Sequence, residues 1–173
     1  MLQTDITINH QAIRDTFNAD RKQMTLMVAR KMRVPEVEVI RSLEGEIAHE
    51  LDSSRWEEII RAFEPLGNVH VIISNGAATM EVFGQFGKFT NIDGFLNIRT
   101  QSLDMHIRSW EIASAFAFRK HSHLDGYETL SFQFFDTTGN SAFKVFLNFG
   151  SKDPTHELMQ KYSAMIEKFK KTK

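Results

Sequence analysis

The segment Asn68-Val-His-Val-Ile-Ile-Ser-Asn-Gly-Ala-Ala-Thr-Met-Glu-Val-Phe83 decides the fold class. Val69, Val71 and Ile73 fall on alternate positions, which is the period of a β-strand with one buried face. Asn75-Gly76 follows, and this dipeptide supplies the positive φ angles that a tight hairpin turn requires. Thr79–Phe83 then reads as the returning strand. The segment therefore predicts an antiparallel hairpin at the start of a β-rich region.

The same alternation continues towards the C-terminus in five further segments. Strands are expected at Phe95–Arg99, Leu103–Arg108, Ile112–Lys120, Tyr127–Asp136 and Ala142–Phe149. The links between them contain the turn residues Gly94, Asp125-Gly126 and Thr138-Gly139-Asn140. Because short links join antiparallel neighbours, the pattern predicts a large antiparallel meander.

The flanking regions have helical spacing instead. One helix is expected over residues 11–32, and a second opens at Val34-Pro35 and stops at Gly45. Ser53 or Ser54 caps a third, with Trp56, Ile59, Ile60 and Phe63 on its apolar face. After the meander, Asp153 caps and Pro154 begins a closing helix that runs to Phe169. The fold class is therefore α+β: N-terminal helices, a large antiparallel sheet and a C-terminal helix. Residues 1–66 are expected to pack as a helical region on the sheet of residues 67–173, forming one structural domain.

Composition excludes several classes of site. The chain has 173 residues and no cysteine, so disulfides, thiolate nucleophiles and Cys-ligated metals are impossible. The net charge of −1 argues against binding dominated by nucleic-acid phosphates. No apolar run is long enough to cross a bilayer, and Met1–Asn9 lacks the pattern of a signal peptide. A soluble cytoplasmic protein is the expectation.

Phenylalanine is concentrated in the β-rich half. Twelve of the 15 Phe residues lie between Phe83 and Phe149. Most are expected in the sheet core, as the alternation around Phe132, Phe134 and Phe143 indicates. A subset in glycine-rich connections is harder to assign to the core and offers a wall for a flat ligand. That subset comprises Phe83, Phe86, Phe89 and Phe95.

The familiar catalytic motifs are absent. The sequence contains no GxxxxGK[ST], HExxH or GxSxG motif. Gly84-Gln85-Phe86-Gly87 has a GxxG spacing, which two turn glycines explain better than a phosphate cradle does. His121-x-His123 adjoins Asp125-Gly126, so an exposed turn is favoured over adventitious metal binding.

Two neighbouring strands offer the most informative polar face. In Leu103–Arg108, His106 and Arg108 alternate with apolar residues, and in the preceding strand Phe95 and Arg99 share a face. A solvated outer face is the ordinary explanation. The functional alternative is a site for a flat apolar anion such as haem, with imidazole as iron ligand and guanidinium for carboxylates.

The N-terminal helices allow a different hypothesis. Residues 22–41 contain five basic and two acidic residues around a short turn, as a helix-turn-helix DNA reader would. The second helix, however, begins with Glu36 and Glu38, and these carboxylates would face the groove. Two packed helices with a solvated charged face are therefore favoured, and nucleic acid is not the expected partner.

Three segments resemble the ChuX/HutX family of intracellular haem-utilisation proteins, and also one half of the longer HemS/HmuS proteins. They are Phe89-Thr-Asn-Ile-Asp-Gly-Phe-Leu-Asn-Ile-Arg99, Leu103-Asp-Met-His-Ile-Arg108 and Ile112-Ala-Ser-Ala-Phe-Ala-Phe-Arg-Lys120. Leu130-Ser-Phe-Gln-Phe-Phe-Asp136 continues the resemblance, and Met27–Leu43 is similar to the family's helical region.

The resemblance implies a cytoplasmic haem carrier that forms a homodimer. It implies that His106 is the axial iron ligand and that Arg108 and Arg99 contact the haem propionates. Some relatives have a second His where this chain has Ile73-Ser74-Asn75, and some have Tyr where it has Phe95-Leu96. His70 and Tyr127 are therefore the alternative ligands.

The expected partners are haem and a cytoplasmic protein that receives or degrades it. Longer relatives have been linked to haem breakdown, so a haem-degrading enzyme stays open beside the carrier.

Overall fold

The computed structural model describes residues 8–172. Residues 1–7 and Lys173 lie outside this range. Most of Met1–Asn9, the segment in which no signal peptide is expected, is therefore not described. Within residues 8–172, no helix combines the length and the apolar character needed to cross a bilayer.

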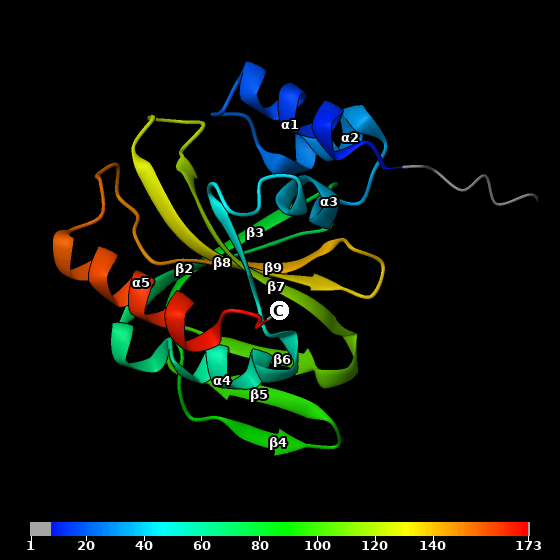
Figure 1. The fold of residues 1–173 in the computed structure, drawn as a ribbon. Helices are drawn as coiled ribbons and strands as arrows, with labels where there is room; N and C mark the ends of the chain where they lie inside the picture. The colour runs from blue at the N-terminus through cyan, green and yellow to red at the C-terminus, as the bar shows by residue number, and fades with distance from the viewer. Residues whose placement is uncertain (1–7, 173) are drawn as a thin grey trace, which may run out of the picture.

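A six-stranded antiparallel sheet forms the centre of the molecule (Figure 1). Its spatial order is β1-β7-β8-β9-β2-β3. The strands are β1 (Ala48–Leu51), β2 (Asn68–Ser74), β3 (Thr79–Gln85), β7 (Ile112–His121), β8 (Glu128–Asp136) and β9 (Ser141–Phe146). The hairpin predicted at Asn75-Gly76 joins β2 to β3, with Val71 opposite Val82.

Three further strands form a separate small sheet below the large one (Figure 1). They are β4 (Thr90–Ile92), β5 (Phe95–Arg99) and β6 (Asp104–Arg108), paired antiparallel in that order. The antiparallel pairing is as expected, but the meander is divided between two sheets.

The helices cover both faces of the large sheet. On one side lie α1 (His10–Ala19), α2 (Thr25–Met32) and α3 (Glu36–Arg41); on the other lie α4 (Trp56–Arg61), α5 (His156–Phe169) and the small sheet (Figure 1). Short 3₁₀ turns occupy Ser53–Arg55, Glu64–Leu66 and Ser109–Glu111. The α+β class is confirmed.

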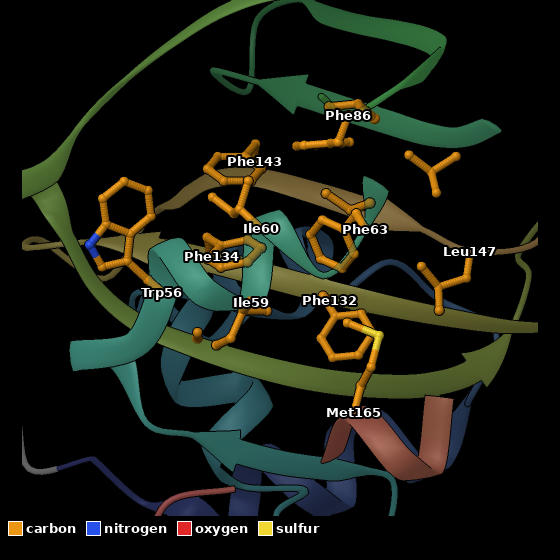
Figure 2. Close-up of a cluster of buried hydrophobic side chains, with 14 of the residues drawn as sticks. Trp56, Ile59, Ile60, Phe63, Phe86, Phe132, Phe134, Phe143, Leu147 and Met165 are labelled. Atoms are coloured by element: carbon orange, nitrogen blue, oxygen red, sulfur yellow. The ribbon is translucent and has the colours of Figure 1, made fainter. Parts of the chain in front are cut away.

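Alternation along the strands builds two cores. Phe63 of the α4 region meets Phe86, Phe132 and Phe134 with ring centroids 5.2–6.4 Å apart, and this larger core continues to the small sheet (Figure 2). On the opposite face of the sheet, Phe116 and Phe118 of β7 and Phe135 of β8 pack under α1–α3. Because the helices cover only part of that second face, the remainder borders open space.

Two strands were missed by the sequence prediction. β1 lies within the region predicted as helical, residues 1–66, and pairs with β7 through Ala48 opposite Phe118. β4 has only three residues, all exposed, so it lacks the buried alternation that reveals a strand. The outer edge of β1 is covered by the C-terminal segment, since Lys171 N–H donates to Glu50 O at 3.1 Å.

The helix boundaries also differ from the prediction. The helix expected over residues 11–32 is divided at Asp20, where the backbone is extended and the carboxylate accepts the Lys22 N–H at 3.0 Å. Such a local bond competes with the helical ladder. The closing helix is capped by Thr155, not Asp153, because the Asp153 carboxylate accepts the Glu128 N–H at 2.8 Å instead.

Candidate functional site

The outer face of the small sheet carries four of the predicted residues. In β6 the inward side chains Met105 and Ile107 are buried, while Asp104, His106 and Arg108 are exposed. In β5 the inward residues Leu96 and Ile98 join the larger core, which leaves Phe95, Asn97 and Arg99 outside. The alternation predicted for these two strands is therefore present. Their register sets Phe95 opposite Arg108, Asn97 opposite His106 and Arg99 opposite Asp104.

His106 is held in one orientation by Asn97. The Nδ1 atom of His106 lies 2.5 Å from Asn97 Oδ1. The amide group of Asn97 donates in turn to the carbonyl oxygens of Thr90 at 3.2 Å and Phe95 at 3.4 Å, so its oxygen must face the imidazole. Because an amide oxygen only accepts, Nδ1 of His106 is the protonated nitrogen, and Nε2 carries the lone pair in the neutral ring.

Charged side chains surround that nitrogen. Asp104 Oδ1 lies 3.4 Å from His106 Nε2, and Asp104 Oδ2 lies 3.4 Å from Arg99 Nε. The Arg108 guanidinium stands 5.8 Å above the Phe95 ring, at the opposite end of the strand pair. The face thus presents an imidazole between two arginines.

Part of this face, including Arg99 and His106 but not Arg108, lines an open concavity of about 900 Å³. Thr90, Ile92 and Lys88 form its β4 side, and Phe95 supplies its aromatic side. Trp110, which is 56% exposed, packs edge-on against Phe95 with ring centroids 5.6 Å apart. The concavity therefore combines an oriented nitrogen ligand, cations and aromatic area. Among residues 8–172, no three His, Asp or Glu side chains gather to hold a free metal ion.

The other three predicted residues line a different cavity. A cleft of about 1000 Å³ lies between α2 and the uncovered half of the large sheet, and it contains His70, Phe83 and Tyr127. The His70 ring stacks on Phe83 with centroids 4.3 Å apart. His70 Nε2 lies 2.8 Å from Glu81 Oε2, but the two groups are not aligned as a hydrogen bond.

Buried polar groups line the floor of this cleft. Lys144 Nζ pairs with the buried Glu36 carboxylate at 2.5 Å. Burial, and then the nearby charge of Lys144, lower the pKa of Lys120 to about 8. Gln133 is 3% exposed, and its Oε1 has no hydrogen-bond partner among residues 8–172. The floor of the cleft thus holds two lysines, one buried carboxylate and an amide oxygen that lacks a hydrogen-bond partner among the described residues.

The candidate site residues predicted from the sequence are therefore divided between two cavities. Phe83 and Phe95 face different cavities, so they cannot form one wall, and this part of the prediction is wrong. Phe86 is 2% exposed and belongs to the core beside Phe63, because the chain turns inward after β3. Phe89 lies under the Arg61 guanidinium at 4.8 Å.

Three contributing residues were not singled out as site residues from the sequence: Asn97, Lys120 and Gln133. Asn97 could have been found from its place on the same strand face as Phe95 and Arg99. Lys120 and Gln133 face the cleft only because α2 leaves that half of the sheet uncovered, and strand alternation carries no information about helix placement.

Two other sequence features have ordinary structural roles. His121 Nδ1 lies 2.9 Å from Gly126 O and helps to close the β7–β8 hairpin. α3, the second helix of the helix-turn-helix hypothesis, has six residues and is buried throughout Glu36–Ile40. A helix that is buried in this way has no face to place in a DNA groove.

The fold is a helix-flanked antiparallel sheet with two cavities, one on the outer face of the small sheet and one between α2 and the large sheet. The model of the haem utilisation ChuX/HutX family matches residues 49–165, and the chain belongs to this family. No curated protein sequence matches the chain.

Solved structures share the fold over most of the chain. A protein of Erwinia carotovora is 19% identical with a TM-score of 0.83, over 95% of this chain and 100% of its own. The structure described as the haem-binding protein ChuX is 16% identical with a TM-score of 0.79, over 90% and 97%. ChuS, described as a haem-degrading enzyme of Escherichia coli O157:H7, is 23% identical with a TM-score of 0.77; 95% of this chain covers 47% of ChuS.

Proposed function

We propose that this protein binds haem on the outer face of the small sheet and passes it to another protein. The observation that carries the proposal is the orientation of His106, whose Nδ1 is engaged by Asn97 at 2.5 Å. A histidine that binds iron through one nitrogen commonly donates the proton of the other nitrogen to an oxygen. Membership of a haem-utilisation family supports haem as the ligand.

The surrounding residues fit the chemistry of haem. Arg99 and Arg108 supply guanidinium groups for the two propionates, and Phe95 supplies apolar area for the ring. Since the chain has no cysteine, the iron ligand must be imidazole or another non-thiolate group. The half-exposed His106, at 52%, leaves its ligand accessible, which suits a protein that must release haem.

Hemin titration tests this proposal directly. The wild type is expected to give a saturable shift of the Soret band, and His106→Ala is expected to alter that spectrum and weaken binding. His70→Ala, which removes the imidazole of the cleft, serves as the matched control and is expected to bind as the wild type does. If His70→Ala abolishes binding while His106→Ala does not, the ligand lies in the cleft with Phe83 and Tyr127. Absence of saturation in the wild type contradicts haem binding altogether.

Haem degradation is the rival activity, and the likeness to ChuS is the observation that favours it. Bound haem is exposed to a reductant and oxygen with catalase present, so that free peroxide cannot attack the ring. A carrier keeps its Soret band, whereas an enzyme loses it and releases new products.

Homodimer formation, a cytoplasmic location and delivery to a haem-receiving or haem-degrading protein belong to the same proposal. Pull-down of haem-loaded and haem-free protein from the cytoplasmic fraction would test the delivery step, because an acceptor is expected to prefer the loaded form.

A further inference from the structure

A chain of hydrogen bonds on the floor of the cleft fixes the orientation of the Gln133 amide. Gln133 Nε2 donates to Ser131 Oγ at 3.1 Å, and Ser131 Oγ donates in turn to the backbone oxygen of Phe118 at 3.1 Å. Because the single proton of the serine hydroxyl is used on Phe118, Ser131 Oγ can only accept from Gln133. The amide nitrogen must therefore face Ser131, and the carbonyl oxygen Oε1 is turned away from it.

That oxygen is buried and accepts no hydrogen bond from residues 8–172. Gln133 is 3% exposed, and its Oε1 lacks a donor in this part of the chain. Lys144 stands opposite Gln133 in the strand register, but its ammonium group is held by the buried Glu36 carboxylate at 2.5 Å. A buried acceptor that is left unpaired costs stability. Because Gln133 lines the cleft, a molecule in the cleft is in a position to supply the N–H or O–H that Oε1 lacks.

Aromatic side chains form a strip across the same floor. Phe146, His70 and Phe83 are cross-strand neighbours on β9, β2 and β3, so they share one face of the sheet. Ring centroids are 6.1 Å apart between Phe146 and His70, and 4.3 Å apart between His70 and Phe83, whose rings are stacked. Phe149 extends the strip, with its ring centroid 5.0 Å from that of Phe83. All four residues line the cleft.

The aromatic strip begins beside this acceptor. Ser131, which holds the Gln133 amide, lies directly opposite Phe146 in the strand register. Gln133 is therefore the diagonal neighbour of Phe146, at a spacing of roughly 7–8 Å. On the opposite wall of the cleft, Leu26 and Ala29 of α2 supply further apolar area. The cleft thus offers a surface for flat rings that ends at a single hydrogen-bond acceptor.

We propose that this cleft binds a planar aromatic molecule that carries an N–H or O–H donor, with its rings on the Phe146–His70–Phe83 strip and its donor on Gln133 Oε1. The site is separate from the haem-binding face proposed above and does not depend on it. Haem does not supply this donor, because ionised propionates only accept hydrogen bonds and the ring nitrogens carry no proton once iron is bound. The acceptor therefore selects a ring that bears a donor over a purely apolar ring.

Two probes of nearly equal size test the role of the donor. Indole carries an N–H group, whereas indene has a CH₂ group in its place. Each probe is titrated into the haem-free wild type and followed by ¹H–¹⁵N NMR, so the result is independent of haem binding. Both are expected to shift backbone amides around the cleft and to leave those of β4–β6 unchanged. Indole should bind roughly 3–10-fold more tightly than indene, which is the usual effect of one hydrogen bond to a neutral acceptor.

Three variants, each verified as folded by circular dichroism, assign the preference to its residues. Gln133→Met keeps the length of the side chain without the amide oxygen and should bind the two probes equally. Gln160→Met, at an exposed position of α5 on the other side of the sheet, is the matched control and should keep the preference. Phe83→Ala, at a half-exposed position, should weaken both probes and leave their ratio unchanged.

The wild-type comparison needs no variant and can overturn the proposal by itself. Equal affinity for indole and indene, which is the result expected if an ordered water alone satisfies Gln133 Oε1, contradicts the site. Failure of both probes to bind, or amide shifts confined to β4–β6, also contradicts it. A preference for indole that persists in Gln133→Met would show that another group accepts the hydrogen bond, and would overturn the assignment to Gln133.

Discussion

A single amide decides which nitrogen of His106 is available. The Asn97 side chain is fixed through its own donors to Thr90 O and Phe95 O, and its oxygen then selects the imidazole tautomer. The iron-binding role proposed for His106 therefore also depends on Asn97 in the adjacent strand. Asn97 can orient the imidazole because the strand register sets the two residues opposite each other.

Asn97→Leu is expected to weaken hemin binding by about 10–100-fold, which is typical when the partner of a metal-binding histidine is lost. Asn97→Asp retains an acceptor and should keep affinity close to that of the wild type. ¹⁵N NMR of His106 in the absence of haem should show loss of the Nδ1–H tautomer only in the Leu variant. An unchanged tautomer in that variant would contradict the orienting role.

Lys120 makes stability depend on pH. Burial and the charge of Lys144 lower its pKa from 10.5 to about 8 in the folded chain. Between these values the unfolded chain binds the proton more tightly, so the free energy of unfolding rises with pH through this window. Its ammonium group also donates to Lys22 O at 3.0 Å.

Chemical unfolding of the wild type and Lys120→Met at pH 7 and pH 10 measures this effect. The difference in unfolding free energy should move in favour of the wild type at the higher pH. A difference that stays constant would show that the Lys120 pKa is the same in both states.

At the scale of elements, the β4–β5 hairpin borders the face on which haem binding is proposed. Asp93 and Gly94 form its two-residue turn, with φ of 50° and 79°, as a type I′ turn requires. A Cβ atom on Gly94 would lie 2.5 Å from Cζ3 of Trp110. Gly94 therefore permits the left-handed backbone of the turn, and it also leaves the space in which the Trp110 ring packs against Phe95.

Gly94→Ala is expected to lower stability by about 1–2 kcal/mol through its left-handed backbone, and to displace Trp110 as well. Gly150→Ala is the matched control, because φ is 81° there and nothing lies within 4 Å of the added Cβ. Tryptophan fluorescence should change only in the Gly94 variant, because Trp110 lies against that glycine. The other tryptophan, Trp56, is buried in the larger core. Equal spectra for the two variants would contradict the contact.

At the scale of the whole molecule, local patterns predicted the elements better than their arrangement. Strand alternation identified β2, β5 and β6 and the outward direction of His106 and Arg108. It could not show that β2 pairs with β9, because that pairing joins Val71 to Val145, which lie 74 positions apart in the sequence. For the same reason the sequence predicts one wall from Phe83 and Phe95, although these residues face different cavities.

The strand order also has a consequence during protein synthesis. The centre of the large sheet is β7–β8–β9, whereas β1, β2 and β3 are added at its edges. The ribosome releases residues 8–111 before the strands on which they dock exist. The β2–β3 hairpin therefore lacks its β9 neighbour, and β1 lacks its β7 neighbour, until those strands emerge. Compact structure is acquired late in translation, and the nascent N-terminal half is the stage at which chaperone protection matters most.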